Sequence, residues 1–169
     1  IKNGEIIDGT GAPKFKSDIV IDSGRIIGVF PAENGDVRDP SENHFLSNFE
    51  AKLTINAENK IVSPGFIDVH THDDDNVFLD PSMSSKISQG VTTCVAGNCG
   101  ISLAPFSYKG EVPAPIALLG KSEVFRFPRV NDYKEEFNNK PSSVNLALLT
   151  GHSMFCLLYT SPSPRDRYI

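Results

Sequence analysis

Two short apolar segments separated by a helical segment restrict the folds open to this chain more than any other feature. Residues 66–70 and 91–96 are compact and rich in apolar or β-branched side chains, as in buried strands. Between them, Asp80 and Pro81 form a helix start signal, and Gly90 is a suitable helix end. A strand, a helix and a second strand in this order predict a right-handed parallel crossover.

The rest of the chain extends this plan in both directions. A short helix over 132–139 and a third buried strand over 144–150 follow the crossover. The first third instead predicts part of a small β-sandwich, with strands over 5–7, 18–22, 25–30, 53–56 and 60–62. The polar stretch 31–50 is expected to be a surface insertion, and His44 within it is expected to be solvated.

Composition excludes several classes of function. Hydrophobic residues make up 39% of the chain and charged residues 22%, which is close to an ordinary globular domain once glycine is counted. The net charge of -5 and the lack of a Lys/Arg cluster argue against nucleic acid as a partner. No apolar run approaches the ~20 residues of a membrane span. Three cysteines do not make a disulfide framework, so we expect a reducing, cytoplasmic location.

Length sets a further limit. A complete (β/α)8 barrel needs about 250 residues, and this chain has 169. The chain also begins at Ile1, without methionine, within a strand-like phrase. We therefore expect it to be a piece of a longer protein.

Two histidines stand at the end of the first parallel strand. With a period of two, Asp68, His70 and His72 point to the same face, and the histidines lie at the carboxyl end, where parallel barrels place catalytic groups. Two imidazoles one residue apart can bind a single metal ion such as zinc. The alternative is a pair of surface histidines, and the spacing alone leaves both open.

Cys99 follows the second parallel strand, between Asn98 and Gly100. A thiolate in such a loop is well placed to bind a metal ion or bridge two of them, although an inert small residue in a tight loop is the alternative. Cys94 lies inside the strand and is expected to be structural.

Three further polar positions adjoin these residues. Asp73 and Asp74 can orient histidine ligands, or they can belong to an acidic loop that caps the next element. His152 follows the third strand and can contact substrate or support the site, but we do not expect it to bind the metal directly. The sequence contains no P-loop, H-E-x-x-H or G-x-S-x-G motif.

Several phrases of the sequence are those of a known family. Ser-Pro-Gly-Phe-Ile-Asp-Val-His-Thr-His-Asp at 63–73 resembles the first barrel strand of the amidohydrolase superfamily. Narrower matches are Lys-Ile-Ser-Gln-Gly-Val-Thr-Thr at 86–93 and Gly-Asn-Cys-Gly-Ile-Ser-Leu-Ala-Pro at 97–105. With the opening phrase at 2–13, they make residues 1–155 similar to the N-acyl-D-amino-acid deacylase (D-aminoacylase) family.

The resemblance implies a zinc-dependent (β/α)8 barrel that carries a β-sandwich and hydrolyses the amide bond of small N-acylated D-amino acids. It implies His70, His72 and Cys99 as ligands of a zinc ion (Zn2+). The family's other ligands and its catalytic Asp come later in its chain, so we expect no activity from these residues alone. The fold class expected is α/β: the N-terminal part of a sandwich over 1–62, then about three strand–helix units of an incomplete barrel over 63–155. No oligomeric state is predicted.

The family pattern ends at Phe155. Residues 156–166 match the in-frame translation of a transposase-type sequencing adapter, so we expect 156–169 to be a non-native, extended or weakly attached tail, with Leu157 and Leu158 making an apolar contact. Two alternatives to the deacylase remain. One is another amidohydrolase, such as a cyclic-amide hydrolase or a deaminase, although Cys99 argues against it. The other is a non-catalytic, β-rich binding domain.

Overall fold

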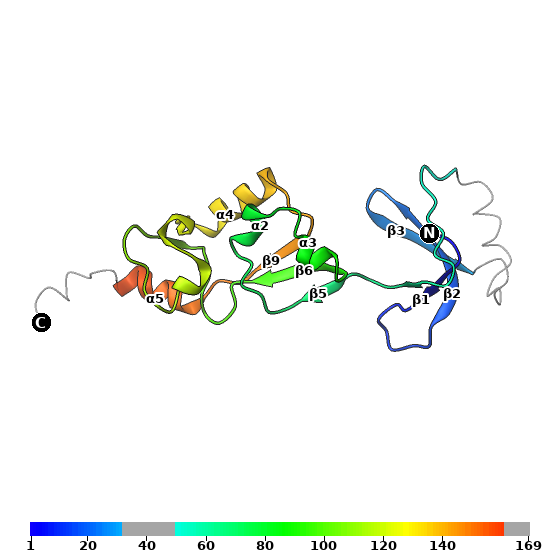
Figure 1. Cartoon of the computed structure of the whole chain (residues 1–169), viewed down its shortest axis with the longest axis horizontal. Coiled ribbons are helices and arrows are strands. Elements are labelled where there is room, and N and C mark those ends of the chain that lie inside the picture. The colour runs from blue at the N-terminus through cyan, green and yellow to red at the C-terminus, as the bar shows by residue number, and fades with distance from the viewer. Residues whose placement is uncertain (32–49, 161–169) are drawn as a thin grey trace, which may run out of the picture. The chain divides into compact units, whose positions relative to one another are not determined.

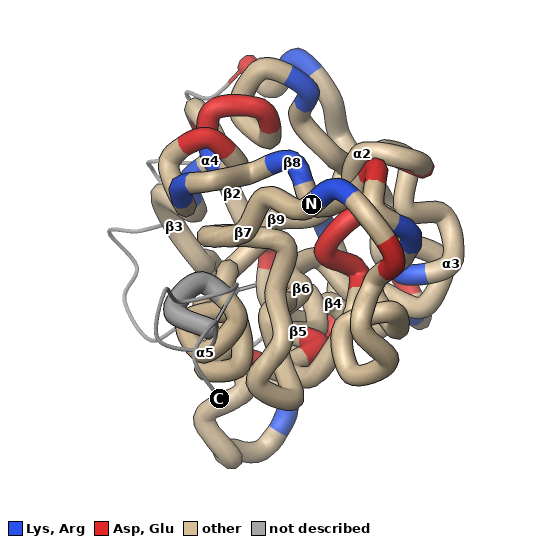
Figure 2. Tube along the Cα trace, turned by 90° about the vertical axis from the view of Figure 1, so that its left-hand side faces the viewer, with Lys and Arg blue, Asp and Glu red and all other residues tan. Residues whose placement is uncertain are grey.

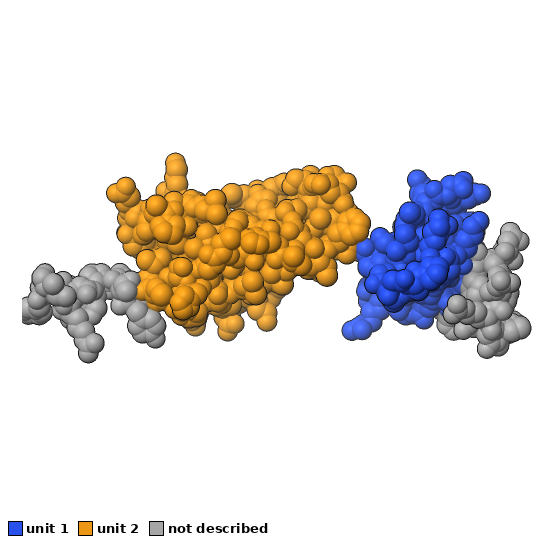
Figure 3. Space-filling model, turned by 90° about the horizontal axis from the view of Figure 1, so that it is seen from below, with its two compact units in different colours: residues 1–64 blue, residues 65–169 orange. Residues whose placement is uncertain are grey.

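The computed structural model of the chain describes residues 1–31 and 50–160. The chain divides into two compact units, unit 1 over Ile1–Pro64 and unit 2 over Gly65–Ile169 (Figure 3). Most of the insertion predicted over 31–50, His44 included, and the end of the tail predicted over 156–169 lie outside the described residues. No helix among the residues described is long and apolar enough to cross a membrane.

Unit 1 is built on one sheet of four strands in the order β3-β2-β1-β4. Figure 1 labels β1, β2 and β3 of this sheet. The strands are β1 Gly4–Ile6, β2 Phe15–Asp22, β3 Arg25–Pro31 and β4 Ile61–Val62. β2 and β3 form the predicted hairpin, because Ser23 (φ 48°) and Gly24 (φ 75°) both adopt the left-handed conformation that suits a tight turn. The described part of this unit shows one sheet, so the second layer of the predicted sandwich is not among these residues.

The strand predicted over 53–56 is wrong. Only Asn56 pairs, through an isolated bridge to Lys2, and β4 pairs in parallel with β1 instead. The Asn56 side-chain oxygen accepts a hydrogen bond from the Glu58 N–H at 3.1 Å, which forms a local turn. The turn at Asn56 follows directly on residues 53–55, and these residues do not form the strand that was expected beside residues 60–62.

Unit 2 contains a parallel sheet in the order β5-β6-β9, which confirms the predicted parallel pairing. Its strands are β5 Phe66–Asp68, β6 Val91–Ala96 and β9 Asn145–Leu148. Because β6 pairs in parallel with both neighbours, the three strands end at the same edge of the sheet. The segments that carry His70, Cys99 and His152 leave from this edge.

The helix predicted over 80–90 begins later and is shorter than expected. Met83 has a left-handed backbone (φ 45°), and the Asp80 carboxylate accepts a hydrogen bond from the Ser82 hydroxyl instead of capping a helix. The helix ends before Gly90, which was expected to end it: Ser88 is the C-cap, and Gly90 follows in a turn with φ 80°. The single-turn helix α3 Ser84–Ile87 is what forms there, and a second single-turn helix, α2 Asn76–Leu79, lies before it, where none was predicted.

Between β6 and β9 the chain makes an ordered excursion whose small elements the sequence did not predict. Its elements are β7 Phe106–Ser107, the 3-10 turns η1 Ala117–Leu119 and η2 Ser122–Val124, β8 Arg126–Phe127, and α4 Val130–Asn139, which contains the helix predicted over 132–139. β7 pairs antiparallel with β8. Arg126 links β8 to α4, because its guanidinium lies over the Phe127 ring and 2.9 Å from Glu136.

The core of unit 2 fills the space between this excursion and the segments that flank the sheet. Its largest fully buried side chains include Met83, Leu103, Ile116, Phe125, Tyr133 and Met154. Phe78 of α2 contacts Tyr133 and Phe137 of α4 edge-on, which places these two helices together, as Figure 1 shows.

The last described element is α5, His152–Thr160, so the first residues of the tail expected to be extended or weakly attached are helical and not extended. Their non-native origin stays a prediction. The run from His152 contains apolar residues at helical spacing, and Met154 is fully buried. Leu157 packs against the core, as predicted. The side chain of Leu158 is not described.

Candidate metal centre

Three side chains meet at the carboxyl edge of the parallel sheet. His70, His72 and Cys99 each offer one ligand atom, and these atoms all lie within 4.8 Å of one another. The Cys99 sulfur lies 3.1 Å from His70 Nε2, and the two imidazole ring centres lie 5.9 Å apart. The thiol and the two imidazoles therefore form one cluster, which we call the thiol–imidazole cluster.

The backbone between the two histidines is held by hydrogen bonds. Thr71 is buried, and both its N–H (3.1 Å) and its hydroxyl (3.2 Å) donate to the carbonyl of Val95 in β6. The strand predicted over 66–70 is shorter than expected: β5 ends at Asp68 and His70 lies in a bend, so strand alternation does not set the direction of the two imidazoles. The two hydrogen bonds of Thr71 instead fasten the segment between the histidines to β6.

Cys99 is presented by a loop with an unusual backbone. Gly97 (φ 80°), Cys99 (φ 54°) and Gly100 (φ 75°) all adopt the left-handed conformation, which costs a non-glycine residue about 1–2 kcal/mol. The Asn98 amide donates to the carbonyls of Val95 (2.7 Å) and Thr71 (3.3 Å). Asn98 thereby fastens the cysteine loop to the segment that carries the histidines.

The donor set fits a zinc ion. Thiolate and imidazole are the ligands that zinc prefers, and three protein ligands leave a coordination position for substrate or water. The Nδ1 atom of His72 is buried and has no hydrogen-bond partner among the described residues. His70 and Cys99 are exposed, so a small molecule can reach the cluster from solvent.

Asp74 lies behind the cluster and is completely buried. Its carboxylate accepts a hydrogen bond from the Gly97 N–H at 3.3 Å, and its backbone carbonyl accepts one from the Tyr133 hydroxyl at 2.6 Å. Burial raises the pKa of this carboxyl group. Asp74 therefore supports the cysteine loop from within the core.

Asp68 and Asp73 share a cation that sequence reasoning missed. Lys86 Nζ of α3 lies 2.8 Å from Asp68 and 3.0 Å from Asp73. The hydrogen bond from Lys86 lowers the pKa of Asp68 and raises that of Lys86. One feature of the sequence could have indicated a role for Lys86: it is the only charged residue between Asp80 and Lys109.

His152, the remaining candidate, is not part of the thiol–imidazole cluster. It is exposed at the start of α5, with its Nε2 3.9 Å from the Cys156 sulfur.

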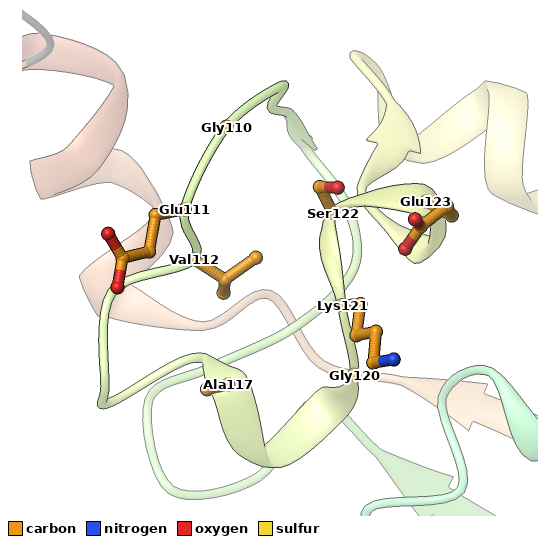
Figure 4. Close-up of a pocket in the computed structure, with 8 residues that line it drawn as sticks. All are labelled: Gly110, Glu111, Val112, Ala117, Gly120, Lys121, Ser122 and Glu123. Atoms are coloured by element: carbon orange, nitrogen blue, oxygen red, sulfur yellow. The ribbon is translucent and has the colours of Figure 1, made fainter.

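A hollow of about 420 Å³ in the excursion between β7 and β8 is also separate from the cluster, and its lining includes Glu111, Lys121 and Glu123 (Figure 4). Over the described residues, acidic and basic positions are interspersed along the trace (Figure 2).

Comparison with known proteins places these observations in context. The sequence matches the amidohydrolase family over residues 53–156. An N-acyl-D-aspartate deacylase of Alcaligenes xylosoxydans xylosoxydans is 39% identical over 153 residues, which are 90% of this chain and 28% of that protein.

Solved structures give the same picture. A D-aminoacylase crystal structure matches with a TM-score of 0.80 and 42% identity, over 98% of this chain and 31% of that one. An N-acyl-D-glutamate deacylase of Bordetella bronchiseptica, complexed with zinc and a phosphonate inhibitor, matches with a TM-score of 0.79 and 36% identity, over 98% of this chain and 33% of that one. The chain spans about a third of the length of these relatives, or less.

Proposed function

The chain belongs to the amidohydrolase family, and on that premise we propose that it is the N-terminal part of a zinc-dependent enzyme that hydrolyses the amide bond of N-acyl-D-amino acids. The products are a carboxylate and a free D-amino acid. The observation that carries the proposal is the thiol–imidazole cluster, in which His70, His72 and Cys99 bring zinc-type donors within 4.8 Å of one another.

In this proposal His70, His72 and Cys99 hold the metal. A bound zinc ion supplies a Lewis acid that polarises the amide carbonyl and lowers the pKa of water. The chain's own residues fix the ligands in place: Thr71 anchors the histidines to β6, and Asn98 holds the cysteine loop against them. The exposed side of His70 and Cys99 is where a small substrate has access.

We assign no residue of this chain to proton transfer. The nearby carboxylates are held away from solvent or in ion pairs: Asp68 and Asp73 are paired with Lys86, and Asp74 is buried, with one oxygen bound by the Gly97 N–H and the other without a hydrogen-bond partner among the described residues. A general acid or base must be able to reach the reacting group. The 169 residues by themselves are therefore expected to bind metal without turnover.

A chimaera tests this function directly. Residues 1–155 of this chain replace the corresponding segment of the D-aminoacylase of known structure, and N-acetyl-D-amino acids are assayed with added zinc. We expect hydrolysis of D but not L substrates, and a loss of activity in the Cys99→Ser chimaera. The Cys94→Ser chimaera is the matched control, because Cys94 is buried within β6 and outside the cluster. A chimaera that hydrolyses cyclic amides instead, or turnover by the 169-residue chain alone, contradicts the proposal.

A further inference from the structure

The surroundings of Lys86 assign it a function of its own, which rests on the metal centre proposed above. We propose that Lys86 is a positioning residue that determines metal specificity. Its ammonium group engages the carboxylates of Asp68 and Asp73 and so keeps oxygen ligands out of the thiol–imidazole cluster, which makes the cluster selective for zinc over harder cations such as manganese.

The contacts define a bridge across the metal-binding segment. Asp68 comes two residues before His70, and Asp73 follows His72 directly. Lys86 reaches both carboxylates from α3, at 2.8 Å and 3.0 Å. The contact to Asp68 is a hydrogen bond, whereas the contact to Asp73 is an ion pair whose carboxylate oxygen has no hydrogen-bond partner among the described residues. One side chain thus holds both ends of the segment that presents the two histidines.

The two carboxylates are engaged further by their own surroundings. The second oxygen of Asp68 accepts a hydrogen bond from the His70 N–H at 3.3 Å, and the second oxygen of Asp73 accepts one from Asn76 at 3.4 Å. The side chains of Lys86 and Asp73 are only 22% and 18% exposed. Neither carboxylate belongs to the group of ligand atoms that the described residues bring together.

Ligand chemistry gives this arrangement its consequence. Thiolate and imidazole select zinc, whereas carboxylate oxygens favour manganese and magnesium. Without Lys86, two carboxylates next to the histidines become free to act as oxygen ligands. Removal of the positive charge of Lys86 also raises the affinity of the site for every divalent cation, because the Coulomb repulsion that is lost is the same for ions of equal charge. The ratio of zinc to manganese affinity therefore isolates the effect of ligand type.

The experiment measures zinc and manganese dissociation constants of the chimaera described above, in which residues 1–155 of this chain are joined to the rest of the D-aminoacylase, by competition with a chromophoric chelator. We expect Lys86→Met to lower the preference for zinc over manganese by about tenfold or more, as for other residues that support metal ligands. Lys86→Arg, which still bridges two carboxylates, retains the preference. Lys134→Met, at an exposed lysine of α4, is the matched control and leaves it unchanged.

A further variant separates this function from a merely structural one. If Lys86 acts by occupying the carboxylates, then Lys86→Met combined with Asp68→Asn and Asp73→Asn restores the zinc preference, whereas a structural role predicts a further loss. Circular dichroism verifies folding, and Lys86→Gln provides the same comparison if Lys86→Met unfolds.

The outcomes distinguish the two proposals. A preference that Lys86→Met and Lys86→Gln leave unchanged within about twofold overturns the function of Lys86 alone. Zinc binding by the parent chimaera that Cys99→Ser does not weaken, or the absence of such binding, overturns the metal centre and the inference with it.

Discussion

Gly97→Ala is the most informative single perturbation of this structure. A methyl group at Gly97 meets the Leu149 carbonyl oxygen at 2.0 Å, far inside contact distance, and the backbone φ of 80° is itself unfavourable for alanine. The left-handed conformation costs about 1–2 kcal/mol. The clash adds to this cost, because Leu149 directly follows β9 and its N–H donates to the Ala96 carbonyl of β6 at 2.9 Å, which holds its backbone in place. We expect a total loss of unfolding free energy of at least about 3 kcal/mol.

Gly100→Ala is the matched comparison within the same loop. Its φ is 75°, but a methyl group there meets only the Ser153 hydroxyl, at an ordinary 3.4 Å. Only the conformational cost of about 1–2 kcal/mol applies. Urea unfolding of both variants, followed by circular dichroism, gives the difference. Equal losses for the two variants refute the reasoning, because they show that the chain absorbs the clash with Leu149 at no cost.

Three further predictions concern the site and its support. Cys99→Ser abolishes the thiolate charge-transfer absorption of the cobalt-loaded chain and weakens zinc binding at least about tenfold, while the exposed position of Cys99 leaves the urea midpoint nearly unchanged. Tyr133→Phe costs about 1–3 kcal/mol of unfolding free energy, because the buried carbonyl of Asp74 loses its 2.6 Å hydrogen bond; a loss below about 0.5 kcal/mol in urea contradicts this. We expect the 169-residue chain to self-associate through the exposed edge strand β5, and Ile67→Lys, at a side chain that is 61% exposed there, to reduce this association in analytical ultracentrifugation; an unchanged sedimentation profile contradicts this.

Local signals in the sequence account for much of what was predicted. β6 is recognisable because β-branched residues surround Cys94, and the β2–β3 hairpin because Ser23 and Gly24 suit a tight turn. The meeting of His70 with Cys99 follows from parallel pairing, since loops after adjacent parallel strands share an edge.

The incorrect or missing structural predictions have two physical causes: local turns that compete with regular structure, and contacts between residues far apart in the sequence. Asn56 forms a turn where a strand was expected, and Met83 interrupts the predicted helix with a backbone conformation that its residue type does not signal. The hydrogen bond from Tyr133 to Asp74 joins residues 59 positions apart. A local stretch of sequence cannot predict a contact between residues so far apart. The contacts of Lys86 are likewise unpredictable, because they depend on which carboxylates the fold brings next to it.

The separation of Cys99 from His70 along the chain is only 29 residues. Contacts of short sequence separation form early in folding, and chains fold from the N-terminus during synthesis. The donors of the thiol–imidazole cluster therefore come together while later segments are still being made. Under the proposed function, metal capture then belongs to the biogenesis of the protein, and the zinc available to the nascent chain, with a thiol that is still reduced, decides whether the proposed centre is correctly filled.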